Sequence, residues 1–120
     1  MQPLISVVVA TFKQDNTLLR ALDSLAEQTY KNFEIIVVDD NADEDFNTRV
    51  EKLVSLFCEE HKHINLKFIV NTKNLGSAHT RNVGIDASTG EYITFLDDDD
   101  LYLPENLEKQ IENMLKTDAD

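Results

Sequence analysis

Four consecutive aspartates, residues 97–100, follow directly on a hydrophobic segment at 92–96. Two unit charges about 4 Å apart repel each other by about 4 kcal/mol at an effective dielectric constant of 20, so converging carboxylates need a compensating charge. Mg²⁺ or Mn²⁺ would supply it, because these ions take oxygen ligands and commonly bind through one or two carboxylates together with substrate phosphates. The alternative is a solvated acidic loop that only ends a strand, since runs of like charge are usually exposed.

A second acidic pair, Asp39 and Asp40, stands at the end of another hydrophobic segment, residues 33–40. Residues 4–10 and 66–70 form similar segments. Short runs of this kind are typical of strands that are buried on both faces. The sequence therefore places acidic residues at the carboxyl ends of separate buried strands.

Segments with apolar residues at helical spacing alternate with these strands. They are a helix with Leu18, Leu22 and Leu25; a helix with Phe46, Val50, Leu53, Val54 and Phe57; a helix over 77–87; and a final helix with Pro104 in its first turn and Leu107, Ile111, Met114 and Leu115 on its apolar face. With a fourth strand at 91–96, the alternation predicts one α/β domain over residues 1–120. Its fold should be Rossmann-like and doubly wound, with a mainly parallel sheet and helices on both faces.

Parallel strands bring their carboxyl ends to the same end of a sheet. In open α/β sheets, ligands bind beyond these ends, where the strand order reverses. The end of the first strand at Thr11, the pair at 39–40 and the run at 97–100 should therefore lie together. Convergence of two acidic clusters favours a cation site over a solvated loop.

The composition is that of an acidic globular protein. Its 120 residues are 42% hydrophobic and carry a net charge of −12, from 11 Lys and Arg against 23 Asp and Glu. The charge argues against nucleic-acid partners and unaided contact with anionic membranes, which need clustered cations. No apolar run approaches the roughly 20 residues of a membrane span. Cys58 is the only cysteine, so we expect a cytoplasmic protein, with any membrane association through parts absent from this sequence.

Five stretches of the sequence, taken in their order along the chain, indicate a relationship to a known family. They are SVVVATF (6–12), SLAEQTY (24–30), NFEIIVVDDNADED (32–45), NLGSAHTRNVGI (74–85) and GEYITFLDDDDLYLPENL (90–107). Together they resemble the nucleotide-sugar-binding half of the family-2 glycosyltransferases, which have the GT-A fold. Each stretch is modest evidence, but five in the order of the family cover nearly the whole chain.

The resemblance implies a nucleotide site built from the strand ends. Its members are Ala10, Thr11, Phe12, Asp39, Asp40, Asn74, Gly76, Arg81, Asp97 and Asp98. By the same resemblance, Asp40, and after it Asp39, is expected to contact the base and ribose. Arg81 is implied as the cation near the nucleotide. Asp99, with Asp97 as its companion, is the implied ligand of Mg²⁺ or Mn²⁺.

The chain departs from the family pattern at three positions. Phe12 and Lys13 replace the usual Tyr-Asn, and Thr80 replaces the usual Ala. Two alternatives also stay open. Arg81 would serve equally as one partner of an ion pair on a helix surface, since such pairs are common. Gly76 would serve equally as a turn glycine, because a backbone requirement says nothing about a ligand.

The reaction implied by the resemblance is transfer of a sugar from a nucleotide-diphosphate sugar, with a UDP-sugar favoured, to an acceptor hydroxyl with inversion. The metal would neutralise the departing diphosphate. The catalytic base normally lies in the second half of the family's domain, so we expect it beyond residue 120. We therefore expect a domain truncated on its C-terminal side and inactive alone. The alternative is a non-catalytic nucleotide-binding or interaction module. An uncovered sheet edge also predicts a homodimer.

Overall fold

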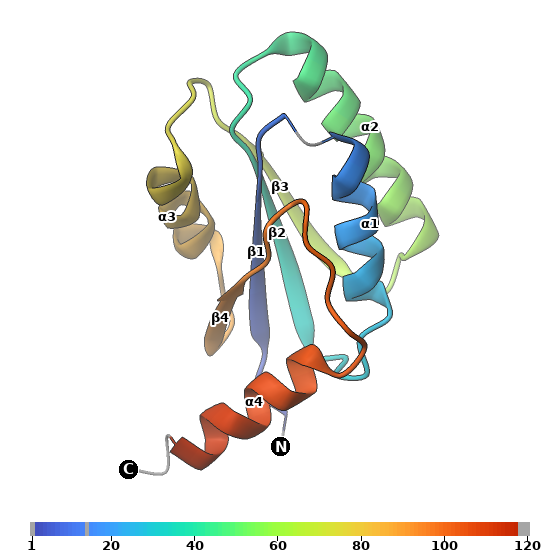
Figure 1. The fold of residues 1–120 in the computed structure, drawn as a ribbon, viewed down its shortest axis with the longest axis vertical. Coiled ribbons are helices and arrows are strands. Elements are labelled where there is room, and N and C mark those ends of the chain that lie inside the picture. The colour runs from blue at the N-terminus through green and yellow to red at the C-terminus, as the bar shows by residue number, and fades with distance from the viewer. Residues whose placement is uncertain (1, 14, 118–120) are drawn as a thin grey trace.

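The computed structural model describes residues 2–13 and 15–117 (Figure 1). Strands and helices alternate along the described chain as predicted. In order they are β1 (Ile5–Thr11), α1 (Asp15–Ala26), β2 (Phe33–Asp39), α2 (Glu44–Glu60), β3 (Asn65–Val70), α3 (Ser77–Ala87), β4 (Tyr92–Phe95) and α4 (Asn106–Thr117). Each predicted strand agrees with the observed one to within a residue at either end.

The four strands form one parallel sheet in the order β3-β2-β1-β4. β1 is in register with β2, with Ile5 opposite Phe33 and Thr11 opposite Asp39. The chain builds outward from β1 through β2 to β3, and then crosses to place β4 on the free side of β1. The Rossmann-like fold is confirmed, and the strand order reverses between β1 and β4.

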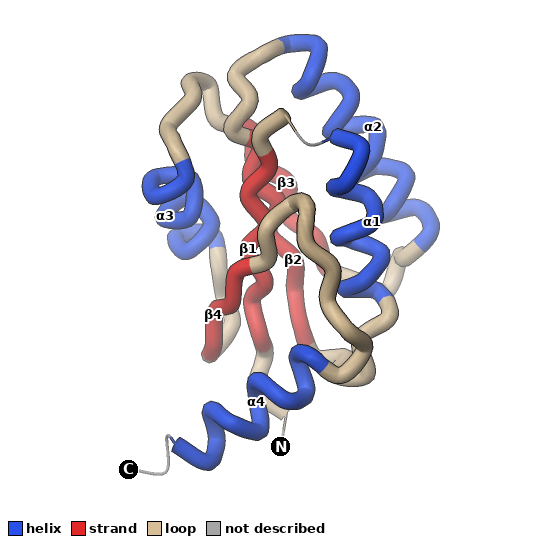
Figure 2. The backbone as a smooth tube through the Cα atoms, viewed as in Figure 1, coloured by secondary structure: helices blue, strands red, loops and turns tan. Residues whose placement is uncertain are grey.

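Helices cover both faces of this sheet. α1 and α2 lie on one face and α3 on the other (Figure 1, Figure 2). Alternate residues of a strand point to opposite faces, so Val7 joins the core beneath α1 and α2, whereas Val8 faces α3. A Cβ atom on Gly84 of α3 would lie 2.3 Å from Val8 Cγ1. The absence of a side chain at Gly84 therefore sets how closely α3 packs on β1.

The outer strands differ from the inner pair in burial. Every residue of β2 is buried, whereas β3 and β4 are partly exposed, and Phe95 at the end of β4 is 40% exposed. This partial exposure arises because β3 and β4 each pair with only one neighbour among the described residues. Continuous apolar sequence does not distinguish an outer strand from an inner one.

The final helix begins at Asn106 rather than at Pro104, which stands in the turn before it. Leu107 and Ile111 are buried as predicted. Leu115 is exposed instead of buried, because α4 runs away from the sheet toward the C-terminus (Figure 1). Within the described residues, we find no helix whose length and apolar character would let it cross a membrane.

A buried carboxylate lies near the amino end of the sheet, on the face that α3 covers. Glu34 is 1% exposed and accepts hydrogen bonds from Ser6 Oγ (2.6 Å) and Thr89 N (2.7 Å). Its Oε1 lies 3.3 Å from Lys67 Nζ. Burial by itself raises the pKa of Glu34, but these hydrogen bonds and the ammonium group outweigh it and lower the pKa. The carboxylate thereby fixes the segment between α3 and β4.

Candidate functional site

A cavity of about 330 Å³ lies at the carboxyl end of the sheet, where the strand order reverses. Segments far apart in the sequence line it: the end of β1, the residue after β2, the start of α3 with the loop before it, and the loop after β4. The lining residues are Ala10, Thr11, Phe12, Asp40, Asn74, Gly76, Ser77, Thr80, Arg81, Asp97, Asp98 and Asp99. The predicted convergence of the strand ends is confirmed.

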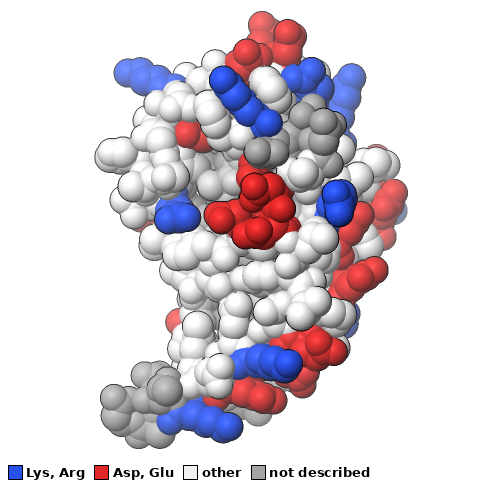
Figure 3. Space-filling view, viewed as in Figure 1, with Lys and Arg blue, Asp and Glu red and all other residues white. Residues whose placement is uncertain are grey.

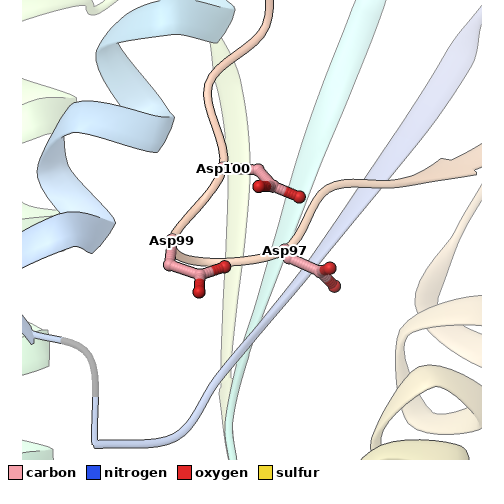
Figure 4. A group of neighbouring side chains, drawn as sticks. All are labelled: Asp97, Asp99 and Asp100. Atoms are coloured by element: carbon pink, nitrogen blue, oxygen red, sulfur yellow. The ribbon is translucent and has the colours of Figure 1, made fainter.

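The aspartates after β4 form a turn, in which Asp100 N donates a hydrogen bond to Asp97 O (3.0 Å). We call residues 97–100 the acidic turn. Asp97, Asp99 and Asp100 are exposed and offer carboxylate oxygens that lie within 4.8 Å of one another (Figure 4). Ligands on opposite sides of a Mg²⁺ ion are about 4.2 Å apart, given bonds of about 2.1 Å. Small side-chain rotations therefore suffice for a shared ion, and these hard oxygen donors fit Mg²⁺ or Mn²⁺.

Asp98 makes a different contact from its neighbours. Its Oδ2 accepts a hydrogen bond from Phe12 N (3.0 Å), which joins the loop after β4 to the loop after β1. Burial raises the pKa of Asp98, and the charges of Asp99 and Asp97 raise it further. Asp98 thus connects the two loops that meet between β1 and β4.

The loop after β1 holds an exposed aromatic ring beside the cavity. Phe12 is 43% exposed, and Lys13 Nζ lies 5.2 Å from the centroid of its ring. Lys13 has a φ of 57°, which is uncommon outside glycine, and its N donates to Asn41 Oδ1 (2.6 Å). The residue that departs from the family's usual Tyr therefore still offers an aromatic face for stacking against a flat ligand.

Asp40 is buried, and its carboxylate holds the loop between β3 and α3. Oδ1 accepts hydrogen bonds from Leu75 N (2.7 Å) and Asn71 Nδ2 (3.0 Å), and Oδ2 accepts one from Gly76 N (3.0 Å). Asn74 Nδ2 donates to the backbone oxygen of Asp40 (3.0 Å). Burial by itself raises the pKa of Asp40, but the three donors to its carboxylate outweigh it and lower the pKa.

The start of α3 faces the cavity through Gly76 and Ser77. Gly76 has a φ of 84° and precedes the helix without giving it a side-chain cap. A residue with a Cβ atom is disfavoured at this φ. The N-terminus of a helix carries a partial positive charge of about half a unit. The turn glycine therefore also brings helix amide groups toward a cavity that is otherwise rich in carboxylates.

Among the cavity-lining residues of the described chain, Arg81 is the only Lys or Arg. Its Nη2 lies 3.8 Å from Asp97 Oδ1, and its guanidinium carbon lies 5.6 Å from the centroid of Phe95. About half of the side chain is exposed, so the pair contributes little to stability. Figure 3 shows an acidic cluster at the centre of this face, with uncharged surface below it and basic side chains to its left and right.

Of the nucleotide-site and metal residues expected from the sequence, all but Asp39 line the cavity. Asp39 is fully buried, its Oδ1 accepts hydrogen bonds from Asn41, and its Oδ2 has no partner among the described residues. The sequence did not single out Ser77, Thr80 or Asp100 as site residues. Asp100 continues the acidic run and Ser77 follows the turn glycine, so the sequence weakly indicated that both belong to the site.

The fold and the cavity define an α/β domain that binds its ligand beyond the carboxyl ends of parallel strands. The sequence model of glycosyl transferase family 2 matches residues 6–120. The chain belongs to this family.

Relatives and solved structures agree with this assignment. The chain is 33% identical over 113 residues to the UDP-Glc:alpha-D-GlcNAc-diphosphoundecaprenol beta-1,3-glucosyltransferase WfgD of Escherichia coli, covering 94% of this chain and 42% of that protein. It resembles the mannosyltransferase PcManGT of Pyrobaculum calidifontis, in complex with GDP-Man and Mn²⁺, with a TM-score of 0.80 at 27% identity, covering 100% of this chain and 33% of that one. For S. aureus TarS in complex with UDP-GlcNAc, the TM-score is 0.75 at 28% identity, with 97% and 32% covered.

These matches establish a GT-A type fold and a transferase family. The chain spans only 15 to 43% of the length of the eight curated relatives compared with it.

Proposed function

We propose that the cavity binds a nucleotide-diphosphate sugar together with Mg²⁺ or Mn²⁺, as the donor site of an inverting glycosyltransferase. The observation that carries the proposal is the group of three carboxylates, from Asp97, Asp99 and Asp100, beside the cavity and its single arginine. Complexes of similar proteins with GDP-Man and Mn²⁺ and with UDP-GlcNAc support it. The name of the Escherichia coli relative favours a UDP-sugar.

Each part of the cavity has a distinct task in this proposal. The exposed ring of Phe12 stacks on the base, and Asp40 shapes the loop that borders the base and ribose. Arg81 and the start of α3 place positive charge near the diphosphate. Asp97, Asp99 and Asp100 would hold the metal ion, which would supply positive charge to neutralise the departing diphosphate.

Among the described carboxylates that line or adjoin the cavity, none is suited to deprotonate an acceptor. The Asp40 carboxylate is saturated with donors, and Asp98 accepts from Phe12 N. The exposed carboxylates of the acidic turn would be occupied by the metal ion, whose charge would lower their proton affinity. Glu108 accepts from Thr29 Oγ1 at the other end of the sheet (3.0 Å). We therefore propose that the base and the acceptor site lie outside this chain and that the chain alone transfers no sugar.

Calorimetry of the 120-residue chain with UDP, GDP and dTDP, each with and without Mn²⁺, tests this proposal. UDP should bind with Mn²⁺ and lose most of its affinity when EDTA removes the ion. Uridine, which lacks the diphosphate, should bind equally with and without metal. Affinity for UDP that does not depend on Mn²⁺ would refute the cation-assisted site. A second assay, release of UDP from UDP-sugars with a panel of acceptors, should give no acceptor-dependent product.

A non-catalytic nucleotide-binding or interaction module is the second candidate. The observation that favours it is the lack of a candidate base among the described carboxylates at the cavity. We also propose self-association, because Phe95 on the outer strand β4 exposes apolar surface, as do Leu101 and Leu103 in the loop after it. Sedimentation of the chain up to millimolar concentration should reveal a dimer, and only monomer at that concentration would contradict it.

A further inference from the structure

A buried amide side chain stands directly after α1, at the opposite end of the sheet from the cavity. Gln28 is fully buried. Its Nε2 donates hydrogen bonds to Leu103 O (2.7 Å) and Ser24 O (3.1 Å), and its Oε1 accepts one from Leu107 N (3.0 Å). Both amide hydrogens are used. Of the three partners, Leu103 lies in the segment that leads from the acidic turn to α4, and Leu107 lies in the first turn of α4.

Two neighbours of Gln28 hold the same segment. Ser24 Oγ accepts a hydrogen bond from Tyr102 N (3.1 Å), and Thr29 N donates to Pro104 O (2.9 Å). We call residues 102–107 the anchored segment. Figure 2 shows the loop from β4 passing alongside α1 on its way to α4. A single residue, Leu101, separates the acidic turn from the anchored segment.

The acidic turn is therefore held at both of its ends. Before it, Leu96 N donates to Val8 O (3.0 Å), and Asp98 is bound to Phe12 N. After it, the hydrogen bonds of the anchored segment act together with the buried side chain of Leu107, whereas Leu101 and Leu103 are 55% and 70% exposed. Three exposed carboxylates that repel one another would separate if either end were released.

We propose that Gln28 is a positioning residue for the metal site. It fixes the anchored segment against the end of α1, and thereby keeps the oxygens of Asp97, Asp99 and Asp100 close enough to share one ion. This inference rests on the proposed function. It assigns part of the metal affinity to a residue that touches neither the cavity nor the acidic turn.

The variant Gln28→Glu tests the inference with almost no change of shape. It replaces the amide donor with an oxygen, which faces the carbonyl groups of Leu103 and Ser24 and repels them. Mn²⁺ affinity, measured by electron paramagnetic resonance on the 120-residue chain at saturating UDP, should fall about tenfold, as for other residues that support metal ligands. Uridine affinity should stay unchanged, which a general loss of folding would not produce.

The matched control is Glu34→Gln. It disturbs a buried polar group that holds the segment on the other side of β4, through Thr89. It should lower the thermal unfolding midpoint and leave the Mn²⁺ affinity unchanged. An equal loss of Mn²⁺ affinity in Glu34→Gln and Gln28→Glu would overturn the inference, since both effects would then be due to stability.

A milder pair of variants keeps the test decisive if Gln28→Glu does not fold. Ser24→Ala removes the acceptor of Tyr102 N, together with the local hydrogen bond that Ser24 Oγ donates to Ala21 O (2.6 Å). It should weaken Mn²⁺ binding about threefold. Ser24→Thr retains the hydroxyl and should restore the affinity.

Unchanged Mn²⁺ affinity in Ser24→Ala, or in folded Gln28→Glu, overturns the role of the anchored segment while the proposed function stands. Failure of the unmodified chain to bind UDP with Mn²⁺ refutes the proposed function, and the assignment of Gln28 with it.

Discussion

The two acidic clusters at the carboxyl end of the sheet place the same chemical group in opposite surroundings. Asp40 is 5% exposed, and backbone and amide donors saturate its carboxylate. Asp97, Asp99 and Asp100 are exposed and crowd one another. A saturated carboxylate stabilises a loop, whereas crowded and exposed carboxylates offer oxygens to a cation. The supply of hydrogen-bond donors, rather than position at a strand end, separates the two roles.

The largest effect is expected from the saturated carboxylate. Asp40→Ala leaves Leu75 N, Gly76 N and the Asn71 amide without their acceptor, and should lower the free energy of unfolding by about 3 kcal/mol. Because the released loop borders the cavity, uridine and UDP should lose affinity by the same factor. Urea unfolding and calorimetry measure the two effects. Asp86→Ala on the exposed face of α3 is the control. If Asp40→Ala lost affinity for UDP alone, the proposed difference between Asp40 and the acidic turn would be wrong.

The next effect belongs to the exposed carboxylates. Asp99→Ala should weaken UDP binding in the presence of Mn²⁺ about 30-fold, equivalent to about 2 kcal/mol, because one charged ligand is lost. Uridine affinity and the free energy of unfolding should hardly change, since Asp99 is exposed and its removal relieves repulsion. The same calorimetric titrations provide the measurement, with Glu112→Ala on α4 as the control. If Asp40→Ala and Asp99→Ala lose affinity for uridine and for UDP by equal factors, the two clusters do not differ in role.

Glu34 extends the comparison to a third carboxylate, which is saturated with hydrogen-bond donors but lies far from the cavity. Glu34→Gln should cost about 2 kcal/mol of stability at neutral pH. The pKa of Glu34 is lowered from its ordinary value of 4.5, so its contribution is present above that pH and is lost as the pH falls through the lower, folded value. Stability of the unmodified chain should therefore fall more steeply than that of the variant as the pH falls below 4.5. Parallel curves from urea unfolding at each pH would contradict this.

Much of the fold follows from local sequence. Short β-branched segments between helices with amphipathic spacing predict a parallel sheet with helices on both faces, and the acidic strand ends then meet at one place. What local sequence does not determine is which strands are outer ones. β4 is as apolar as β1, and its exposure depends on what pairs with it.

The candidate site could be predicted by position but not by hydrogen bonding. Adjacent strand residues face opposite sides of a sheet, and this alternation explains why Asp40 reaches the cavity while Asp39 is buried away from it. The saturation of Asp40 depends on the path of the loop between β3 and α3, which is a tertiary feature. Gln28 was missed for the same reason, since its partners lie 75 and 79 residues away in the chain.

The contact between Gly84 and Val8 has a mechanical consequence for the cavity. Arg81 precedes Gly84 by three residues, nearly one helical turn, so both lie toward the same side of α3. The gap between α3 and the sheet therefore sets how far the guanidinium group reaches toward Asp97. A single methyl group at position 84 would act as a spacer that shifts the helix and its positive charge outward. The position of the Arg81 charge in the cavity thus depends on residue 84, which does not line the cavity.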